Sequence, residues 1–226
     1  MRDNTASTHW TQYFVYRSDH LRTTWKLRIG LLVLVIVVMW LSRGWWTVAI
    51  ARSLVCEETL APSDAILIEN FDPDYQVFQL ARDLRRAGLS ARVLVPVPVD
   101  PDTMHPNPVA LGIVDVMSGL SQIGQVEIIP IRDVEPITLN ALRDVQTFLE
   151  REHIRSVIAV TPLFRSRRSE LVYSATLGRA GIAVYYQHVH GSTILHTWTR
   201  RWHGVEEIME QWIKLQYYRL YVIPFS

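Results

Sequence analysis

The chain has 226 residues, of which 49% are hydrophobic and 20% charged, as in a globular protein with an added apolar segment. The length fits one domain of about 150 residues with appendages. The 23 Lys and Arg residues nearly balance the 22 Asp and Glu residues, so the net charge of +1 does not favour nucleic acid as a partner. The single cysteine, Cys56, excludes an internal disulfide and a thiolate metal cluster.

The first notable element is an apolar stretch over residues 29–51, which is long enough to cross a lipid bilayer as one helix. Arg43 interrupts the stretch, and its long side chain can reach lipid headgroups. Aromatic residues beside it resemble a membrane-interface belt: Trp40, Trp45 and Trp46. Two alternatives remain open, namely a buried core helix and a signal peptide cleaved near Ala49 and Ala51.

Basic residues precede this stretch and favour an N-terminus in the cytoplasm: Arg17, Arg22, Lys26 and Arg28. The sequence therefore predicts a single-pass protein of the inner membrane. Its parts are a cytoplasmic tail (1–28), a transmembrane helix (29–51), a linker (52–62) and an α/β domain (63–226). The domain lies outside the cytosol, which is the periplasm in a Gram-negative cell.

Beyond residue 62, short apolar runs alternate with segments of helical periodicity, which predicts an α/β domain with a mostly parallel sheet. The predicted strands are 65–68, 92–95, 126–129, 156–160 and 182–186. The predicted helices begin at Asp72 as N-cap and continue to Gly88, then span 109–121, 138–152, 164–180 and 205–220. The proline-rich stretch 96–108 is predicted to be a loop and a candidate lid.

Several blocks of the sequence carry a family resemblance. They are Ser-Asp-Ala-Ile-Leu-Ile at 63–68 with Ala-Gly-Leu-Ser-Ala-Arg-Val-Leu-Val at 87–95, Glu-Pro-Ile-Thr-Leu-Asn-Ala at 135–141, the block 160–169 with its paired arginines, and the tail with Trp202, Gly204, Glu210 and residues 214–218. In order and spacing they resemble the YdcF/SanA/ElyC family of bacterial envelope proteins. The resemblance implies a Rossmann-like sheet with helices on both faces, behind one N-terminal transmembrane helix.

The sequence departs from the family at two places that matter for chemistry. A glycine-rich turn usually follows the first strand, but this chain has Glu69 and Asn70 there, so a phosphate-cradling loop is missing. The third block has Arg165 where the family usually has a histidine. Walker and dinucleotide fingerprints are also missing, so we predict no cofactor and leave enzymatic activity open.

Polar residues after the strands nevertheless predict a ligand site at the carboxyl edge of the sheet, where open parallel sheets bind ligands. The candidate ligand-binding residues are Glu69, Asn70, Glu135, Asn140, Thr161, Arg165 and Arg168. Arg165 and Arg168 are three residues apart and share a helix face, which suits a phosphate or carboxylate.

Structural roles for the same residues remain open. The two arginines could pair with Glu135 or Asp72 to tie loops together. Thr138 is interpreted as an N-cap in preference to a catalytic hydroxyl, and Asn140 could hydrogen-bond a neighbouring loop.

Three histidines near the C-terminus are interpreted as solvated side chains in preference to metal ligands, and no metal is predicted: His188, His190 and His196. The last helix carries an apolar stripe that is expected to dock on the sheet: Val205, Ile208, Met209, Trp212, Leu215 and Tyr218 or Arg219. Its aromatic residues Trp212, Tyr217 and Tyr221 are interpreted in the same way, as packing.

The leading functional hypothesis is a membrane-anchored factor of envelope biogenesis whose extracytoplasmic domain binds a phosphate-bearing ligand, such as a phosphorylated lipid carrier or a lipid-linked sugar. The alternative is a non-catalytic subunit or scaffold that binds other membrane proteins and has a degenerate ligand site. A third hypothesis is a hydrolase or transferase that uses Glu69 or Glu135 as a base. The lipid bilayer is the expected partner in the first two.

Overall fold

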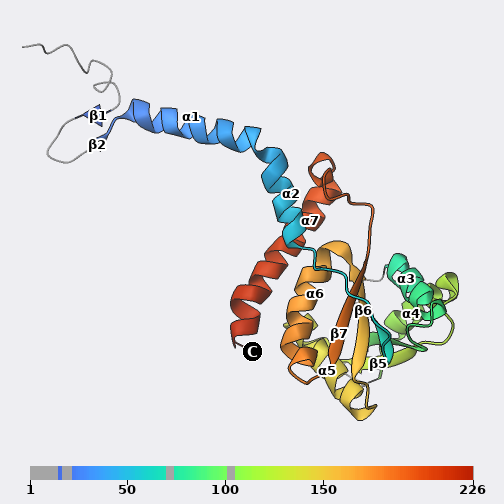
Figure 1. Cartoon of the computed structure of the whole chain (residues 1–226). Coiled ribbons are helices and arrows are strands. Elements are labelled where there is room, and N and C mark those ends of the chain that lie inside the picture. Colours follow the sequence, from blue (N-terminus) through green and yellow to red (C-terminus); the bar gives the residue numbers. More distant parts are fainter. Residues whose placement is uncertain (1–14, 17–21, 70–73, 101–104, 226) are drawn as a thin grey trace, which may run out of the picture. The chain divides into compact units, whose positions relative to one another are not determined.

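The computed structural model describes residues 15–16, 22–69, 74–100 and 105–225 (Figure 1). The chain divides into two compact units, Met1–Val48 and Ala49–Ser226.

The first unit contains two short antiparallel strands, β1 (Val15–Tyr16) and β2 (Arg22–Thr23), and the helix α1 (Trp25–Leu41). No residue of α1 is buried, and its apolar side chains are exposed except that of Leu27, which is half-buried. The next helix, α2 (Arg43–Ser53), begins in this unit after Ser42.

The single helix predicted over residues 29–51 is therefore two helices, bent by 64° where they meet. The Ser42 hydroxyl donates a 2.6 Å hydrogen bond to the carbonyl of Val38, and the Trp46 indole donates one of 3.2 Å to the carbonyl of Met39. Side chains that bond helix carbonyls are a known cause of such bends. Among the described residues no single helix meets the length and hydropathy of a membrane span, whereas α1 and α2 together meet it as a bent pair.

The second unit is built on a five-stranded sheet in which every neighbouring pair is parallel. The strands are β3 (Ala65–Ile68), β4 (Arg92–Pro98), β5 (Glu127–Ile131), β6 (Ser156–Pro162) and β7 (Ala183–Val189). Their order is β5-β4-β3-β6-β7, which is the strand order of a doubly wound sheet. The predicted α/β class is confirmed. The order reverses direction between β3 and β6, and this is the point where such sheets open a crevice.

Helices cover both faces of this sheet, as predicted (Figure 1). On one face Ile66 and Ile68 pack with α3 (Tyr75–Arg86) and α4 (Pro108–Ser121). On the other face Ala65 and Leu67 pack with α5 (Ile137–Arg151), α6 (Ser166–Tyr173) and η3 (Ser174–Gly178). Successive residues of β3 thus face opposite layers, and all four are fully buried, as expected for a central parallel strand.

The C-terminal segment packs around a third, smaller core. It comprises η4 (Trp198–Arg200), α7 (Trp202–Tyr217), η5 (Tyr218–Val222) and η6 (Ile223–Phe225). The core residues are Ala51, Leu54, Leu163, Phe164, Trp198, Ile208 and Leu215. Gly204 allows α7 to approach η4, because a Cβ atom there would lie 2.5 Å from the carbonyl oxygen of Trp198. The predicted docking of this helix on the sheet is wrong for Ile208 and Leu215, which are buried in this third core. It is confirmed for Tyr218, which is buried in the core that contains residues of the strands. Met209 is exposed.

The start of α3 differs from the prediction. The helix begins at Tyr75, and its N-cap is Asp74, whose side chain accepts a 2.9 Å hydrogen bond from the Gln76 amide. The proposed cap Asp72 lies outside the described residues. The end of α3 matches the prediction, because Gly88 follows it with a φ of 76°, the left-handed conformation that glycine adopts most easily.

The prediction of a loop over residues 96–108 is wrong for its first three residues, because β4 continues to Pro98. Beyond Leu94, β4 no longer pairs with β3 and has its register partners in β5 alone. Prolines are tolerated in a strand that is paired on one side, since the missing amide removes no bond from a second neighbour. Residues 101–104 of the suggested lid lie outside the described residues.

Candidate functional site

The first predicted site residue, Glu69, lies at the switch point between β3 and β6. Glu69 directly follows β3, and its amide donates a 3.0 Å hydrogen bond to the carbonyl of Val160 in β6. The side chain is 1% exposed. Its Oε2 accepts a 2.6 Å hydrogen bond from the Ser169 hydroxyl in α6, while Oε1 has no hydrogen-bond partner among the described residues. A buried carboxylate is costly unless its charge is compensated.

Arg168, one residue before Ser169, supplies compensating charge. It is 7% exposed, and its Nε is a buried donor without a hydrogen-bond partner in the described part of the chain. Burial lowers the pKa of the Arg168 guanidinium, and the charge of Glu69 opposes this shift. The group stays protonated at any physiological pH. Its Cζ lies 5.7 Å from the ring centroid of Tyr218, within the range of a cation–π contact.

Arg168 lines a pocket of about 300 Å³, called here the α6–α7 pocket. The other lining residues come from the start of α5, from η2 (Leu163–Arg165) and from the end of α7: Glu135, Ile137, Thr138, Arg165, Lys214, Tyr217 and Tyr218. Three cationic side chains and one carboxylate therefore meet in one cavity. Two of these cations have carboxylates near them, since Glu210 forms an ion pair with Lys214 and Glu69 interacts with Arg168. Guanidinium groups in such a cavity suit a phosphate or carboxylate group.

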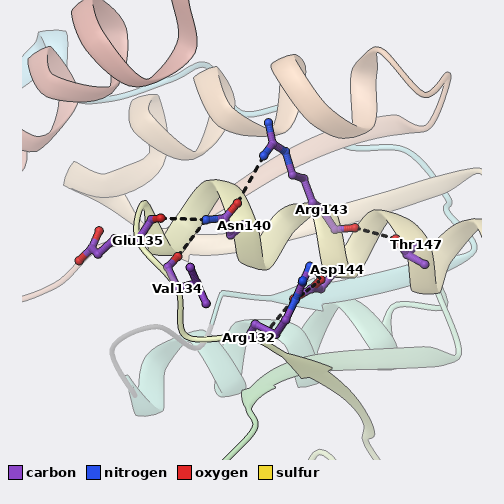
Figure 2. Close-up of polar contacts among 7 residues, drawn as sticks. All are labelled: Arg132, Val134, Glu135, Asn140, Arg143, Asp144 and Thr147. Carbon is purple, nitrogen blue, oxygen red and sulfur yellow. Dashed lines mark hydrogen bonds and ion pairs between the residues drawn. The ribbon is translucent and has the colours of Figure 1, made fainter. Parts of the chain in front are cut away.

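The loop before α5 is held by Asn140 (Figure 2). Its Nδ2 donates hydrogen bonds of 3.0 and 3.1 Å to the carbonyls of Val134 and Glu135, and its Oδ1 accepts one from Arg143. Figure 2 shows that the Glu135 side chain extends away from Asn140. Asn140 therefore has the loop-ordering role considered from the sequence, and it positions the backbone of Glu135 at the pocket.

Two threonines have roles that differ from those predicted. Thr138 is not the N-cap of α5, because the cap position is Pro136 and no side chain caps the helix. Thr138 instead lies in the first turn and lines the pocket. Thr161 is fully buried, and its hydroxyl donates a 3.0 Å hydrogen bond to the carbonyl of Pro162.

The structure thus brings three of the seven predicted ligand-binding residues into one pocket: Glu135, Arg165 and Arg168. Glu69 does not line the pocket, but its charge acts on Arg168, which does. Asn140 and Thr161 do not line it. Asn70 lies outside the described residues.

The sequence interpretation missed the contribution of α7 and η5 to the pocket. Lys214, Tyr217 and Tyr218 are spaced by three and four residues, which places them on one side of a helix. That spacing was the available signal. It could not show that this side meets Arg168, since the two segments are far apart in the chain.

The interpretation of the histidines as solvated is wrong for His188, which is 8% exposed at the end of β7. Its Nε2 lies 3.5 Å from Oε1 of Glu58, and burial lowers the pKa of its imidazole. His190 and His196 are exposed as predicted. Within the described residues no group of three or more His, Cys, Asp or Glu side chains could hold a metal ion.

A second pocket, of about 290 Å³, lies between the β7–α7 connection and the start of α7 and includes Arg200, Arg201 and His203. These side chains are exposed in the structure. A buried cation that is already in place binds an anion with less loss of side-chain entropy. The α6–α7 pocket is therefore the better candidate site.

Strand order and pocket together define a doubly wound α/β protein with an arginine-lined pocket next to the segment that follows β6. Comparison with protein-family models, curated proteins and solved structures finds no match. Membership of the YdcF/SanA/ElyC family therefore stays a prediction from the sequence blocks described above.

Proposed function

We propose that the α/β domain binds an anionic, phosphate-bearing ligand in the α6–α7 pocket. The observation that carries this proposal is the state of Arg168, a buried guanidinium with an unused Nε donor among the described residues. A buried donor without a partner costs about 1 to 3 kcal/mol, and more when it is charged. Arg168 lines the pocket, so a phosphate bound there would add a charge-assisted hydrogen bond to its guanidinium.

The neighbouring groups support a phosphate in particular. Arg165 adds positive charge from η2, Lys214 contributes an ammonium group that also pairs with Glu210, and Thr138 lines the same cavity. A guanidinium can bond two phosphate oxygens at once, while an ammonium adds a point charge. Glu135 is the one carboxylate of the pocket and can accept hydrogen bonds from sugar hydroxyls.

We further propose that the protein is attached to the inner membrane through residues 29–51 and acts in the biogenesis of the cell envelope. The bent pair α1 and α2 has the length and composition of a span. The basic residues before it favour an N-terminus in the cytoplasm and a domain on the outer side. On that side, phosphate-bearing ligands include lipid-linked sugars and their carriers, which is consistent with the family resemblance.

The test uses the full chain purified in detergent micelles. Isothermal titration calorimetry with farnesyl phosphate, a short polyprenyl phosphate, is compared with titration of farnesol, and empty micelles provide the blank. The proposal expects saturable binding of the phosphate and none of the alcohol. Equal heats for the two compounds, or no binding of either, would overturn it.

A second candidate is a non-catalytic subunit of a membrane complex, and the roles of Asn140 and Thr161 favour it. Both are used in internal hydrogen bonds of the loops and strands. A site that has lost its ability to bind a ligand would still keep such structural hydrogen bonds. Purification from membranes in mild detergent discriminates, since this candidate requires a stoichiometric partner protein together with an absence of phosphate binding.

A further inference from the structure

The connection between α2 and β3 is an extended segment that bonds to the free edge of β7. We call residues 55–62 the strap. Among the described strands β7 pairs with β6 alone, so its other edge is open to the strap. The Thr59 amide donates a 3.0 Å hydrogen bond to the carbonyl of Tyr186, and the Thr59 hydroxyl accepts one of 3.0 Å from the Tyr186 amide. The Cys56 amide donates a further bond of 3.0 Å to the hydroxyl of Ser166 in α6.

The strap has little buried surface of its own. All of its residues belong to the described part of the chain, and within it Cys56 alone has a buried side chain. Burial raises the pKa of the Cys56 thiol. Segments with few buried contacts open at a lower free-energy cost than the whole domain. The strap can therefore leave β7 while the sheet stays folded.

His188 of β7 lies beside the strap with one ring nitrogen unused. Its side chain is 6% exposed, and its Nε2 lies 3.5 Å from Oε1 of Glu58 in the strap. Its Nδ1 is a buried atom without a hydrogen-bond partner among the described residues. A charged imidazole carries a proton on both nitrogens, so it would bury a cation with an unpaired N–H group. The docked strap thus favours the neutral ring.

The charges around His188 do not reverse this preference. Burial is the largest effect on the pKa of His188 and lowers it below the ordinary value of 6.5, while Glu58 raises it and His190 lowers it further. The Glu58 side chain is 45% exposed, so water screens its attraction for a charged ring. The ring centroids of His188 and His190 are 5.6 Å apart, and the register partner of His188 in β6 is the uncharged Thr161.

We propose that protonation of His188 releases the strap from β7, which makes the connection between α2 and β3 sensitive to pH. Once the strap has left, water reaches the ring and its pKa returns toward 6.5. Docking is therefore strongest above pH 6.5 and weakens as the pH falls from 6.5 toward the lower pKa of the docked state. Release frees a tether of up to about 28 Å when extended. The inference goes beyond the proposed function, since it needs neither the α6–α7 pocket nor a membrane.

The test follows the labelling of Cys56, the one cysteine of the chain, in the full-length protein in detergent micelles. The reagent is a dithiodipyridine, which reacts with thiols in acid as well as at neutral pH. At each pH, the labelling rate of the urea-unfolded chain is divided by the rate of the folded protein, and the ratio is the protection factor of Cys56. The ratio cancels the pH dependence of the thiol in the released strap.

The protection factor should fall by about threefold to tenfold between about pH 7.5 and 5.5, because a difference of one pKa unit changes an equilibrium about tenfold. His188→Gln should abolish this fall, and the matched variant His190→Gln should keep it. A constant protection factor in the wild type overturns the inference, whether or not His188→Gln folds. A factor that rises in acid also overturns it, because pairing with Glu58 would then outweigh burial. A fall that persists in folded His188→Gln overturns it as well.

A second probe separates release of the strap from opening of the whole domain. Ala81→Cys in a Cys56→Ser background places the thiol in α3, where Ala81 is fully buried on the other face of the sheet. Its protection factor should be the same at both pH values. An equal fall at positions 56 and 81 would overturn the inference, since acid would then open the domain as a whole. Circular dichroism verifies that the variants have the same fold.

Discussion

The hydroxyl of Ser169 donates a 2.6 Å hydrogen bond to the carboxylate of Glu69, and this bond joins α6 to the end of β3 across 100 residues of chain. Both side chains are buried. Replacement of Ser169 by Ala would leave the carboxylate without this donor. We expect Ser169→Ala to lower the free energy of unfolding by about 1 to 3 kcal/mol, because a buried acceptor loses its partner.

The measurement is urea denaturation followed by circular dichroism. Ser118→Ala is the matched control, because the buried Ser118 hydroxyl oxygen has no hydrogen-bond partner among the described residues. This control should be neutral or slightly stabilising, within about 0.5 kcal/mol. If both variants had the same stability, the bond to Glu69 would have no structural importance.

Asn140 provides a second prediction, since its side-chain amide donates to the two carbonyls of the loop before α5. Asn140→Ala removes both bonds and should cost about 1 to 2 kcal/mol of unfolding free energy. It should also weaken ligand binding, because Glu135 loses its fixed position. Thr147→Ala in the same helix removes an exposed bond to the carbonyl of Arg143 and serves as control. A Thr147→Ala variant as unstable as Asn140→Ala would contradict the assigned role.

Gly204 should be intolerant of any side chain. A Cβ atom there would lie 2.5 Å from the Trp198 carbonyl oxygen, a backbone atom that cannot rotate away. We expect Gly204→Ala to cost about 1 to 3 kcal/mol through overpacking, measured as a lower urea midpoint. Gly191→Ala is the control, because a Cβ atom at position 191 would have no atom of the described residues within 4 Å beyond its immediate chain neighbours. Equal midpoints for the two variants would show that α7 can shift away from η4.

Asp64 gives a prediction for pH dependence. Its carboxylate accepts hydrogen bonds from the amides of Arg155 and Ser156, at 2.8 and 2.9 Å, and from the Ser156 hydroxyl. The Arg155 amide is the main reason that the pKa of Asp64 is lower than the ordinary value of 3.8. The folded state therefore favours the charged form.

The stabilisation from Asp64 is complete at neutral pH and is lost as the pH falls below 3.8 through the lower folded pKa. Asp64→Asn should lower the free energy of unfolding at pH 7. In this variant the free energy of unfolding should also fall less between neutral and acid pH than in the wild type. Urea denaturation at a series of pH values checks this, with Asp115→Asn, at an exposed position on α4, as control. Parallel curves for the wild type and Asp64→Asn would contradict the prediction.

Local patterns predicted most of the second unit. The strand over 65–68 is confirmed residue for residue, and the helix expected over 109–121 is observed as Pro108–Ser121. Both signals are local, namely a short apolar run and a helical repeat. Pro108, which was assigned to the preceding loop, is the first residue of the helix. The strand at 92–98 was predicted too short, because the tolerance of Pro96 depends on which strands flank it.

The site was harder to predict because its contacts are long-range. Arg165 and Arg168 were identified from their spacing, yet the partners that complete the pocket come from α7, about 50 residues later in the sequence. The role of Asn140 was left open between ligand and loop, and only its carbonyl partners distinguish the two. At the bend between α1 and α2 the Ser42 and Trp46 side chains donate hydrogen bonds to helix carbonyls, and hydropathy does not predict such bonds.

The most direct test of the central claim is the dissociation constant of farnesyl phosphate for the wild type and for Arg168→Gln. Loss of the buried guanidinium should raise this constant by about tenfold or more, since charge-assisted hydrogen bonds contribute about 1.5 to 3 kcal/mol. The matched variant Arg86→Gln removes an exposed arginine from α3 and should change it by no more than about twofold. Equal dissociation constants for the wild type and Arg168→Gln, with the fold intact by circular dichroism, would contradict the assignment of the α6–α7 pocket as a phosphate site.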